Sequence, residues 1–327
     1  MCSEAYTSTE KVMKYFGNET YKNVHIPFNF RLVELDRDSS ADKLNSLVHD
    51  FIDQMPPHGF PNWQISNHDN HRLASRTSPE FSDAMNMVAL LLPGVVTVYY
   101  GDEIGMEDTR IHLNRIMDVC SSGEYGSGVD QNEFKDGQRA PMQWDDSKNS
   151  GFTNKKVPWM PLNTKYWFKN VQRQLREPKS HLKIFKRIMQ LRNSPVIKNG
   201  DLNTCVLNDW VFTFVRSFKD ELQVVVIVNM GSESEVACAS NCFKYLPDTM
   251  YVHTGSLNAA YNPGDKFFVS NNTRNNVTSF CSVLRPKAGV VLTTAVLSSA
   301  GHASFSIPSL IVLVFLIIAA ENRSWFD

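Results

Sequence analysis

The sequence lacks an excess of either charge, because its 33 Lys and Arg residues are balanced by 34 Asp and Glu residues and the formal net charge is -1. A near-neutral chain gives no electrostatic reason to expect a nucleic acid or an anionic membrane surface as partner. The six cysteines also lack the spacing of a zinc site, since no second Cys pair or His pair accompanies Cys238 and Cys242. We therefore expect no metal and no other cofactor.

A secretory signal is also missing, because Met1-Cys2-Ser3-Glu4 leads straight into polar sequence. Three acceptor tripeptides for N-glycosylation nevertheless occur, at Asn18, Asn271 and Asn276. Four cysteines lie after residue 200, and we expect a disulfide among them without a connectivity from sequence: Cys205, Cys238, Cys242 and Cys281. Features of an exported protein without an export signal predict that the true start of the chain is missing.

What the chain does contain is material for a packed core, at 42% hydrophobic and 11% aromatic residues over 327 positions. Up to about residue 196, apolar stretches that read as strands alternate with stretches at helical spacing. The predicted strands are 24–30, 63–66 and 95–100, and the predicted helices are 10–16, 40–55, 78–92 and 180–192. Each strand ends in polar residues. The alternation predicts an α/β barrel or a doubly wound parallel sheet.

The sequence pattern changes after about residue 197. Residues 210–218 and 222–229 are typical of two strands of a hairpin that turns at Lys219-Asp220, and further short strands follow to residue 293. This pattern predicts a small antiparallel β domain. The long segment 107–165 has little regular pattern, and loops of that length are usually functional.

The stretch NWQISNHDNHRLASR, residues 62–76, carries the strongest functional pattern. An apolar strand stops abruptly at Asn67, His68 and Asp69, as expected for a site at the carboxyl end of a barrel strand. The alternative is a polar turn in which Asn and Asp act only as turn formers.

Five blocks make the chain similar to the alpha-amylase superfamily of glycoside hydrolases, and within it to the insect maltases or alpha-glucosidases. They are SEAYTS at 3–8, HIPFNF at 25–30, SNHDNHRLASR at 66–76, LLPGVVTVYYGDEIGM at 91–106 and RAPMQWDD at 139–146. The resemblance implies an α/β fold that is the carboxyl-terminal half of a (β/α)8 TIM barrel, with strands five to eight in residues 1–196. It further implies an all-β sandwich domain at 197–293, followed by a hydrophobic tail at 294–327.

The same resemblance implies the roles of four residues. Glu4 matches the general acid/base, and Asp69 matches the carboxylate that holds the sugar hydroxyls and stabilises the transition state. His68 and Arg139 match substrate-binding residues. Glycoside hydrolysis needs such carboxyl groups around an oxocarbenium-like transition state. Asp102-Glu103 has no chemical role in the family and is interpreted as part of a structural loop.

The implied activity is hydrolysis of terminal alpha-1,4-linked glucose from maltose, sucrose or short alpha-glucan oligosaccharides by a retaining mechanism. Nothing in the sequence matches the family's aspartate nucleophile, so we expect these 327 residues alone to be inactive. The alternative is a non-catalytic family member that acts as a binding or transporter-associated protein.

The tail combines the small residues 298–301 with an apolar run at 307–320, which is shorter than the roughly 20 residues that span a bilayer. This arrangement favours a lipid-anchor signal, and with it a location outside the cell or at its surface. The last residues, 321–327, are polar where such signals usually end apolar. A retained hydrophobic tail or a frame error near the end are the alternatives.

Overall fold

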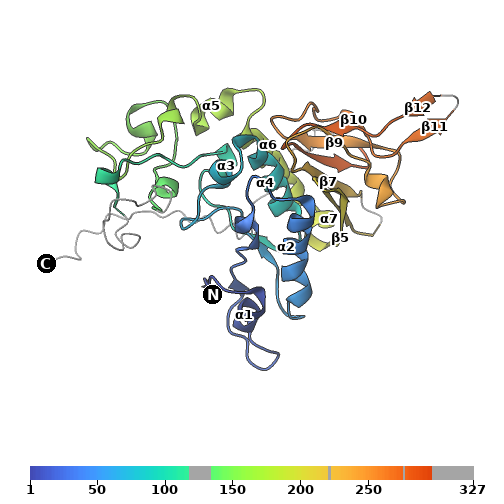
Figure 1. Cartoon of the computed structure of the whole chain (residues 1–327), viewed down its shortest axis with the longest axis horizontal. Coiled ribbons are helices and arrows are strands. Elements are labelled where there is room, and N and C mark those ends of the chain that lie inside the picture. Colours follow the sequence, from blue (N-terminus) through green and yellow to red (C-terminus); the bar gives the residue numbers. More distant parts are fainter. Residues whose placement is uncertain (118–133, 220–221, 275–276, 297–327) are drawn as a thin grey trace.

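The computed structural model describes residues 1–117, 134–219, 222–274 and 277–296. Helices and short parallel strands form the first part of the chain, and a larger antiparallel sheet lies beside them (Figure 1). The described helices of the chain, in order, are α1 (Thr9–Met13), α2 (Ala41–Gln54), α3 (Leu73–Arg76), α4 (Ser82–Leu91), α5 (Val171–Arg176), α6 (His181–Arg192) and α7 (Pro195–Asn199). Single turns of 3-10 helix provide most of the remaining regular structure in the described part of residues 97–170.

Two parallel strand pairs carry the loops at which the chemistry was expected. The strands are β1 (Cys2–Ser3), β2 (Ile26–Pro27), β3 (Asn62–Trp63) and β4 (Val95–Val96), with β1 paired to β2 and β3 to β4. The side chain of Asn62 joins the two pairs. Its Nδ2 donates to the carbonyl of Pro27 at 2.7 Å, and its Oδ1 accepts from the N–H of Asn29 at 2.8 Å.

The predicted lengths of these strands are wrong, because each observed strand has only two residues. Buried guanidinium groups take over the backbone carbonyls beyond the ladders. Arg76 Nη2 donates to Ile65 O at 2.5 Å, and Arg72 Nη1 donates to Tyr100 O at 2.5 Å. A run of apolar residues therefore leaves the sheet without leaving its carbonyl oxygens unpaired.

The helix predictions hold for α2 and α6. Ser40 and Ser180 are their N-caps, each accepting a backbone N–H in the first turn, as N-terminal serines do. The helix predicted at 78–92 begins later than expected. Residues 79–81 form a 3-10 turn with Pro79 at its first position, Ser78 makes no capping bond, and α4 begins at Ser82.

A six-stranded antiparallel sheet follows, in the order β10-β9-β14-β7-β6-β5. Its strands are β5 (Asp201–Asn208), β6 (Val211–Ser217), β7 (Val224–Asn229), β9 (Thr249–Gly255), β10 (Lys266–Phe268) and β14 (Gly289–Thr293). The predicted hairpin is confirmed as β6 and β7. Two small antiparallel pairs accompany the sheet: β8 (Glu235–Val236) with β13 (Val283–Leu284), and β11 (Asn272–Arg274) with β12 (Val277–Ser279).

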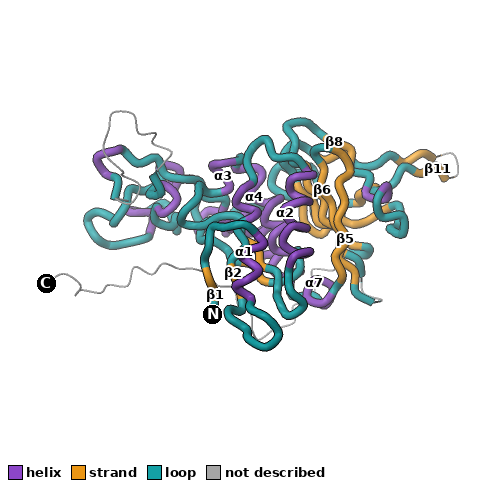
Figure 2. Tube along the Cα trace, turned by 60° about the horizontal axis from the view of Figure 1, so that its bottom comes forward, coloured by secondary structure: helices purple, strands orange, loops and turns teal. Residues whose placement is uncertain are grey.

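Strand β7 is buried on both faces, and its side chains alternate between two cores. Val224, Val226 and Val228 pack with the helices, whereas Val225 and Ile227 pack with the opposite layer. The first core also contains the inner faces of α2, α4 and α6, and Figure 2 shows the sheet stacked against these helices. A continuous apolar strand is expected where both faces of a sheet are covered.

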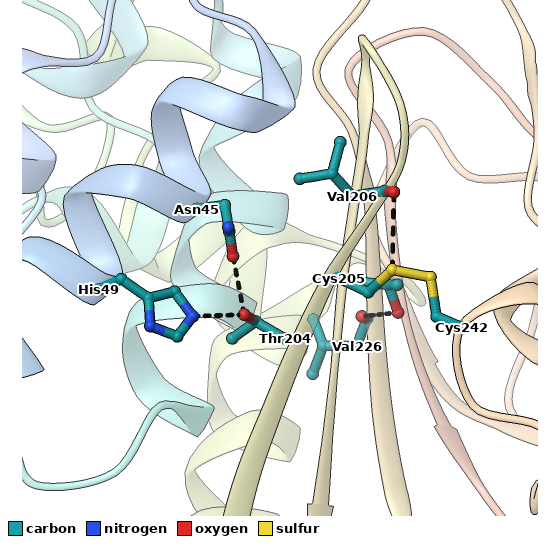
Figure 3. The surroundings of a disulfide bond; sticks show 8 residues. Asn45, His49, Thr204, Cys205, Val206, Val226 and Cys242 are labelled. Carbon is teal, nitrogen blue, oxygen red and sulfur yellow. Dashed lines mark hydrogen bonds between the residues drawn. A yellow bond between two sulfur atoms is a disulfide. The ribbon is translucent and has the colours of Figure 1, made fainter. Parts of the chain in front are cut away.

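The predicted disulfide is confirmed, and the described residues form two: Cys205 pairs with Cys242, and Cys238 pairs with Cys281. Figure 3 shows the first of them beside a polar contact between helix and sheet. The Thr204 hydroxyl donates to Asn45 Oδ1 at 2.7 Å and lies 2.7 Å from His49 Nε2. Strand β5 therefore contacts α2 through Thr204, and it is linked covalently through Cys205 to the segment that contains Cys242.

Candidate active site

The chain brings three of the four predicted catalytic and binding residues directly together. Glu4 follows β1, and His68 and Asp69 lie in the loop after β3. One ligand-type atom from each side chain lies within 4.8 Å of the other two. Glu4 is exposed, and the other two are partly buried. The carboxyl ends of these strands therefore present two carboxyl groups and an imidazole to solvent.

Asn67 shapes the loop that carries His68 and Asp69. Its buried Oδ1 accepts the backbone N–H groups of Asp69 and Asn70 at 3.0 and 2.9 Å. Its Nδ2 donates to the Tyr6 hydroxyl at 2.9 Å. Asn67 is thus a turn former, and the turn that it stabilises places Asp69 in the cluster.

Asp69 is the most highly coordinated residue of the cluster. Its Oδ1 accepts from Lys135 Nζ at 3.0 Å and from Arg139 Nη2 at 3.1 Å, and His68 Nε2 lies 3.7 Å away. Burial raises the pKa of the Asp69 carboxyl, but the hydrogen bond from Lys135 and the positive charges outweigh it, so the pKa is lowered. Asp69 therefore stays ionised at neutral pH.

Arg139, the fourth predicted residue, holds the loop as well as the carboxylate. Its Nε donates to the carbonyl of His68 at 2.9 Å while Nη2 reaches Asp69. One planar guanidinium thus fixes two adjacent residues, which a lysine could not do.

Sequence reasoning missed Tyr6 and Lys135. The Tyr6 hydroxyl donates to Asp69 Oδ2 at 3.3 Å, and its ring stacks on Phe30 with centroids 4.3 Å apart. Burial, followed by the nearby charges of Asp69 and Glu4, raises the pKa of Tyr6, so its hydroxyl remains a donor. Tyr6 lies inside the SEAYTS block, but Lys135 has no signal beyond a positive charge four residues before Arg139.

The residue types of Glu4, His68 and Asp69 could in principle hold a cation. Lys135 and Arg139 already compensate the charge of Asp69, however, and a second cation there would be repelled. Carboxylate acceptors next to ammonium and guanidinium donors suit a neutral ligand with many hydroxyl groups.

A buried framework supports the loops from below. The Arg72 guanidinium lies between the rings of Tyr99 and Tyr100, 4.6 Å from each centroid. It donates to Gln138 O at 2.9 Å as well as to Tyr100 O. Asp102 lies in the 3-10 turn after β4, and burial raises its pKa to about 7.

Glu103 and His71, which lie next to this framework, also make contacts that hold the loops. The Glu103 carboxylate accepts the N–H of Gly101 at 2.7 Å, so this pair belongs to the loop itself, as expected from sequence. His71 Nδ1 lies 2.6 Å from Asp108 Oδ2. Asp108 also accepts the N–H of Arg72 at 3.0 Å, so the His71 pair helps to join the two loops.

The predicted glycosylation sites and the hydrophobic tail are only partly covered by the described residues. Asn18 and Asn271 are exposed, whereas Asn276 and the tail at 297–327 lie outside the described residues. Asn18 Oδ1 accepts the N–H groups of Thr20 and Tyr21. Among the residues that the structure describes, no helix has both the length and the apolar character to cross a bilayer.

The chain is similar in sequence to known proteins. The family described as alpha amylase, catalytic domain, matches residues 1–200. Maltase A1 of Drosophila melanogaster is 34% identical over 81% of this chain and 46% of its own length. Alpha-glucosidase of Apis mellifera is 34% identical over 85% of this chain and 47% of its own length. The chain thus spans about half the length of these relatives.

Two further matches bear on fold and on function. The amino acid transporter heavy chain SLC3A1 of Homo sapiens is 29% identical over 79% of this chain and 36% of its own length. Among solved structures, an inactive double mutant of the trehalulose synthase MutB from Pseudomonas mesoacidophila, in complex with isomaltulose, aligns with a TM-score of 0.70 at 20% identity. That alignment covers 89% of this chain and 55% of MutB, and it shows the shared fold.

Proposed function

The chain belongs to the alpha-amylase catalytic-domain family, and from this premise we propose that it carries half of the active site of a retaining alpha-glucosidase. The observation that carries the proposal is the convergence of Glu4, His68 and Asp69, with Arg139 bound to Asp69. Maltose, sucrose or short alpha-glucan oligosaccharides are the proposed substrates, in keeping with the names of the insect relatives.

In this proposal Glu4 donates a proton to the glycosidic oxygen as that bond breaks, and the family's aspartate nucleophile, for which residues 1–327 contain no match, bonds to the anomeric carbon. Glu4 later takes a proton from the water that displaces this aspartate. Asp69, held ionised, accepts hydrogen bonds from sugar hydroxyls, and these bonds strengthen as positive charge develops on the ring. His68 donates to the same sugar. The exposed position of Glu4 leaves it open to a substrate approaching from solvent.

The finer architecture belongs to the same proposal. We infer that β1 to β4 are strands five to eight of a (β/α)8 barrel, within residues 1–196, and that residues 197–293 form the carboxyl-terminal β-sandwich domain. Two observations support it: the strand pairs are parallel, and the polar cluster lies at their carboxyl ends. In a complete barrel, every strand has a neighbour on both edges.

Residues 1–327 contain no match to the family's nucleophile, so we propose that this polypeptide alone does not release glucose from maltose. The test is a glucose-release assay on purified protein, with Asp69→Asn as control. Glucose release that Asp69→Asn abolishes would contradict the proposed inactivity. Turnover should appear when residues 1–293 replace the matched segment of Drosophila Maltase A1. A folded hybrid that remains inactive would favour the second candidate function.

That second candidate is a non-catalytic binding or transporter-associated protein, and the match to the human heavy chain favours it. The cluster favours the enzyme, because a binding protein has no need of an acid/base residue such as Glu4 beside an ionised Asp69 that is paired with Lys135 and Arg139. Co-purification of a membrane transporter with the chain from its native cells, without glucosidase activity in the hybrid, is the outcome expected for the heavy-chain function.

We also propose a cell-surface location through a lipid anchor, with glycans on Asn18, Asn271 and Asn276. The support is the small-residue and apolar pattern of residues 298–320 and the three acceptor tripeptides. Phosphatidylinositol-specific phospholipase should release the protein from intact insect cells. Retention of protein that still carries an epitope placed after Asp327 would contradict the anchor.

A further inference from the structure

A cavity of about 350 Å³ lies where the loop before α2 meets the antiparallel sheet. It shares no residue with the cluster around Asp69, and its lining comes from both parts of the chain: Arg37, Asp38, Ser78, Glu80, Trp210, Met230, Gly231, Ser232, Pro286 and Lys287. Nothing in the proposed hydrolysis uses it.

Lys287 holds the two walls of this cavity together. Its Nζ donates to the carbonyl of Arg37 at 2.9 Å on one side and to the carbonyl of Met230 on the other. The ammonium also lies 5.5 Å from the centroid of the Phe81 ring. Because these bonds join the loop before α2 to the antiparallel sheet, the cavity is formed before any ligand arrives, as small-molecule sites usually are.

Trp210 supplies an aromatic surface at the cavity. Its side chain remains 38% exposed, and its backbone carbonyl accepts the N–H of Met230 at 2.7 Å. The ring lies against Gly231, where a Cβ would stand 3.0 Å from the indole Cγ. The glycine leaves room for the base of the Trp210 side chain, and part of the tryptophan stays exposed.

The polar groups around Trp210 are available for a ligand. Within the described ranges, the carboxylates of Asp38 and Glu80 accept no hydrogen bond, and the buried Ser78 hydroxyl has no partner. The two negative charges face two positive ones, Arg37 and Lys287, so the lining has no net charge.

These features select a class of ligand. A cationic ligand would meet the positive charges of Arg37 and Lys287, and an anionic ligand would meet the negative charges of Asp38 and Glu80. A neutral ligand would be repelled by neither pair. Free carboxylate oxygens pair best with a molecule rich in hydroxyl groups. A half-open indole gives apolar contact to the C–H face of a pyranose ring.

We propose that this cavity is a second carbohydrate site, in which a glucose unit of a neutral glucan stacks on Trp210 and donates hydroxyl groups to Asp38 and Glu80. The site binds sugar without performing chemistry, and it does not depend on the proposed hydrolysis at Glu4. Its role is to hold a glucan chain on the surface apart from the cluster at Asp69.

Calorimetric titration of maltose into the purified chain tests the site, in an Asp69→Asn background that weakens the first cluster. We expect one maltose site to persist in Asp69→Asn and to disappear in Asp69→Asn with Trp210→Ala. Glu80→Gln in the same background should weaken binding about tenfold, since a hydrogen bond to a charged group is lost. Glu80 is exposed, so this variant keeps the fold even if Trp210→Ala does not.

Trp167→Ala is the matched control, because Trp167 is another exposed tryptophan, at 59%, away from the cavity lining. It should bind maltose as the parent does. The proposal is overturned if the Asp69→Asn protein binds no maltose, or if Trp210→Ala and Glu80→Gln leave its binding unchanged. Maltose binding by the parent that matches Asp69→Asn in both affinity and number of sites would instead count against the proposed function and leave this site standing.

Discussion

The loops after β3 and β4 hold their aspartates in opposite ways, although the two strands are parallel neighbours. Asp69 and Asp102 each lie six residues beyond the end of their strand, at Trp63 and Val96. Asp69 is partly exposed, and its cationic partners lower its pKa, whereas burial raises the pKa of Asp102 to about 7. A carboxyl pKa near neutrality is often taken as a sign of function. Here it marks the supporting loop, and the compensated aspartate belongs to the candidate site.

The comparison implies that changes in the cluster affect turnover, whereas changes in the buried framework affect stability. Glu4→Gln should cause the largest loss, about 10²–10⁴-fold in turnover of the Maltase A1 hybrid, because general acid/base help disappears. The urea midpoint should stay unchanged, since Glu4 is exposed. Steady-state kinetics and urea unfolding of the same preparation measure both. Near-normal turnover would show that Glu4 is not the acid/base.

Arg72→Met should produce the largest loss of stability, about 3–5 kcal/mol, because it removes the charge that faces the buried Asp102. It also leaves the carbonyls of Tyr100 and Gln138 without their donor. Urea unfolding measures the loss. Arg173→Met is the control, since Arg173 is 55% exposed and pairs only with Glu177 on the surface, and it should change stability by less than about 0.5 kcal/mol. Equal effects of both variants would contradict a structural role for Arg72.

Asp102→Asn should change how stability depends on pH. The folded-state pKa of about 7 lies above the unfolded value of 3.8, so the folded state binds the proton more tightly. This contribution is complete below about pH 4 and is lost as pH rises through 7. Its size is on the order of 4 kcal/mol, and Asp102→Asn should remove it.

Urea midpoints at pH 5.5 and pH 8 check this prediction. Asp69→Asn is the contrasting variant, because the lowered pKa of Asp69 places its contribution above the unfolded value, to be lost only in acid. It should leave the profile between pH 5.5 and pH 8 as in the parent. A parallel pH profile for Asp102→Asn and parent would mean that Asp102 is ionised in the fold throughout this range.

His68→Ala should have the smallest effect, about tenfold in kcat/KM of the hybrid, because one hydrogen bond to the sugar is lost. His112→Ala, at an exposed histidine outside the cluster, should leave the hybrid unaffected. A loss as large as that of Glu4→Gln would assign His68 a part in proton transfer.

The sequence predicted elements whose signals are local. The helical spacing in 40–55 and 180–192 predicted α2 and α6, and the apolar runs on either side of Lys219-Asp220 predicted the hairpin of β6 and β7. The short length of β3 and β4 was not predictable, because it depends on Arg72 and Arg76 reaching carbonyls that belong to distant residues. Lys135 is similar: its contact with Asp69 spans 66 positions and leaves no local trace.

The two disulfides have overlapping spans, 205–242 and 238–281, and this gives the sheet a particular response to proteases. A single cut anywhere between 206 and 280 leaves both fragments joined by at least one sulfur bridge. Such a molecule keeps its full mass on a non-reducing gel and separates into two bands only after reduction. A digestive enzyme would therefore nick this part of the protein without shortening it.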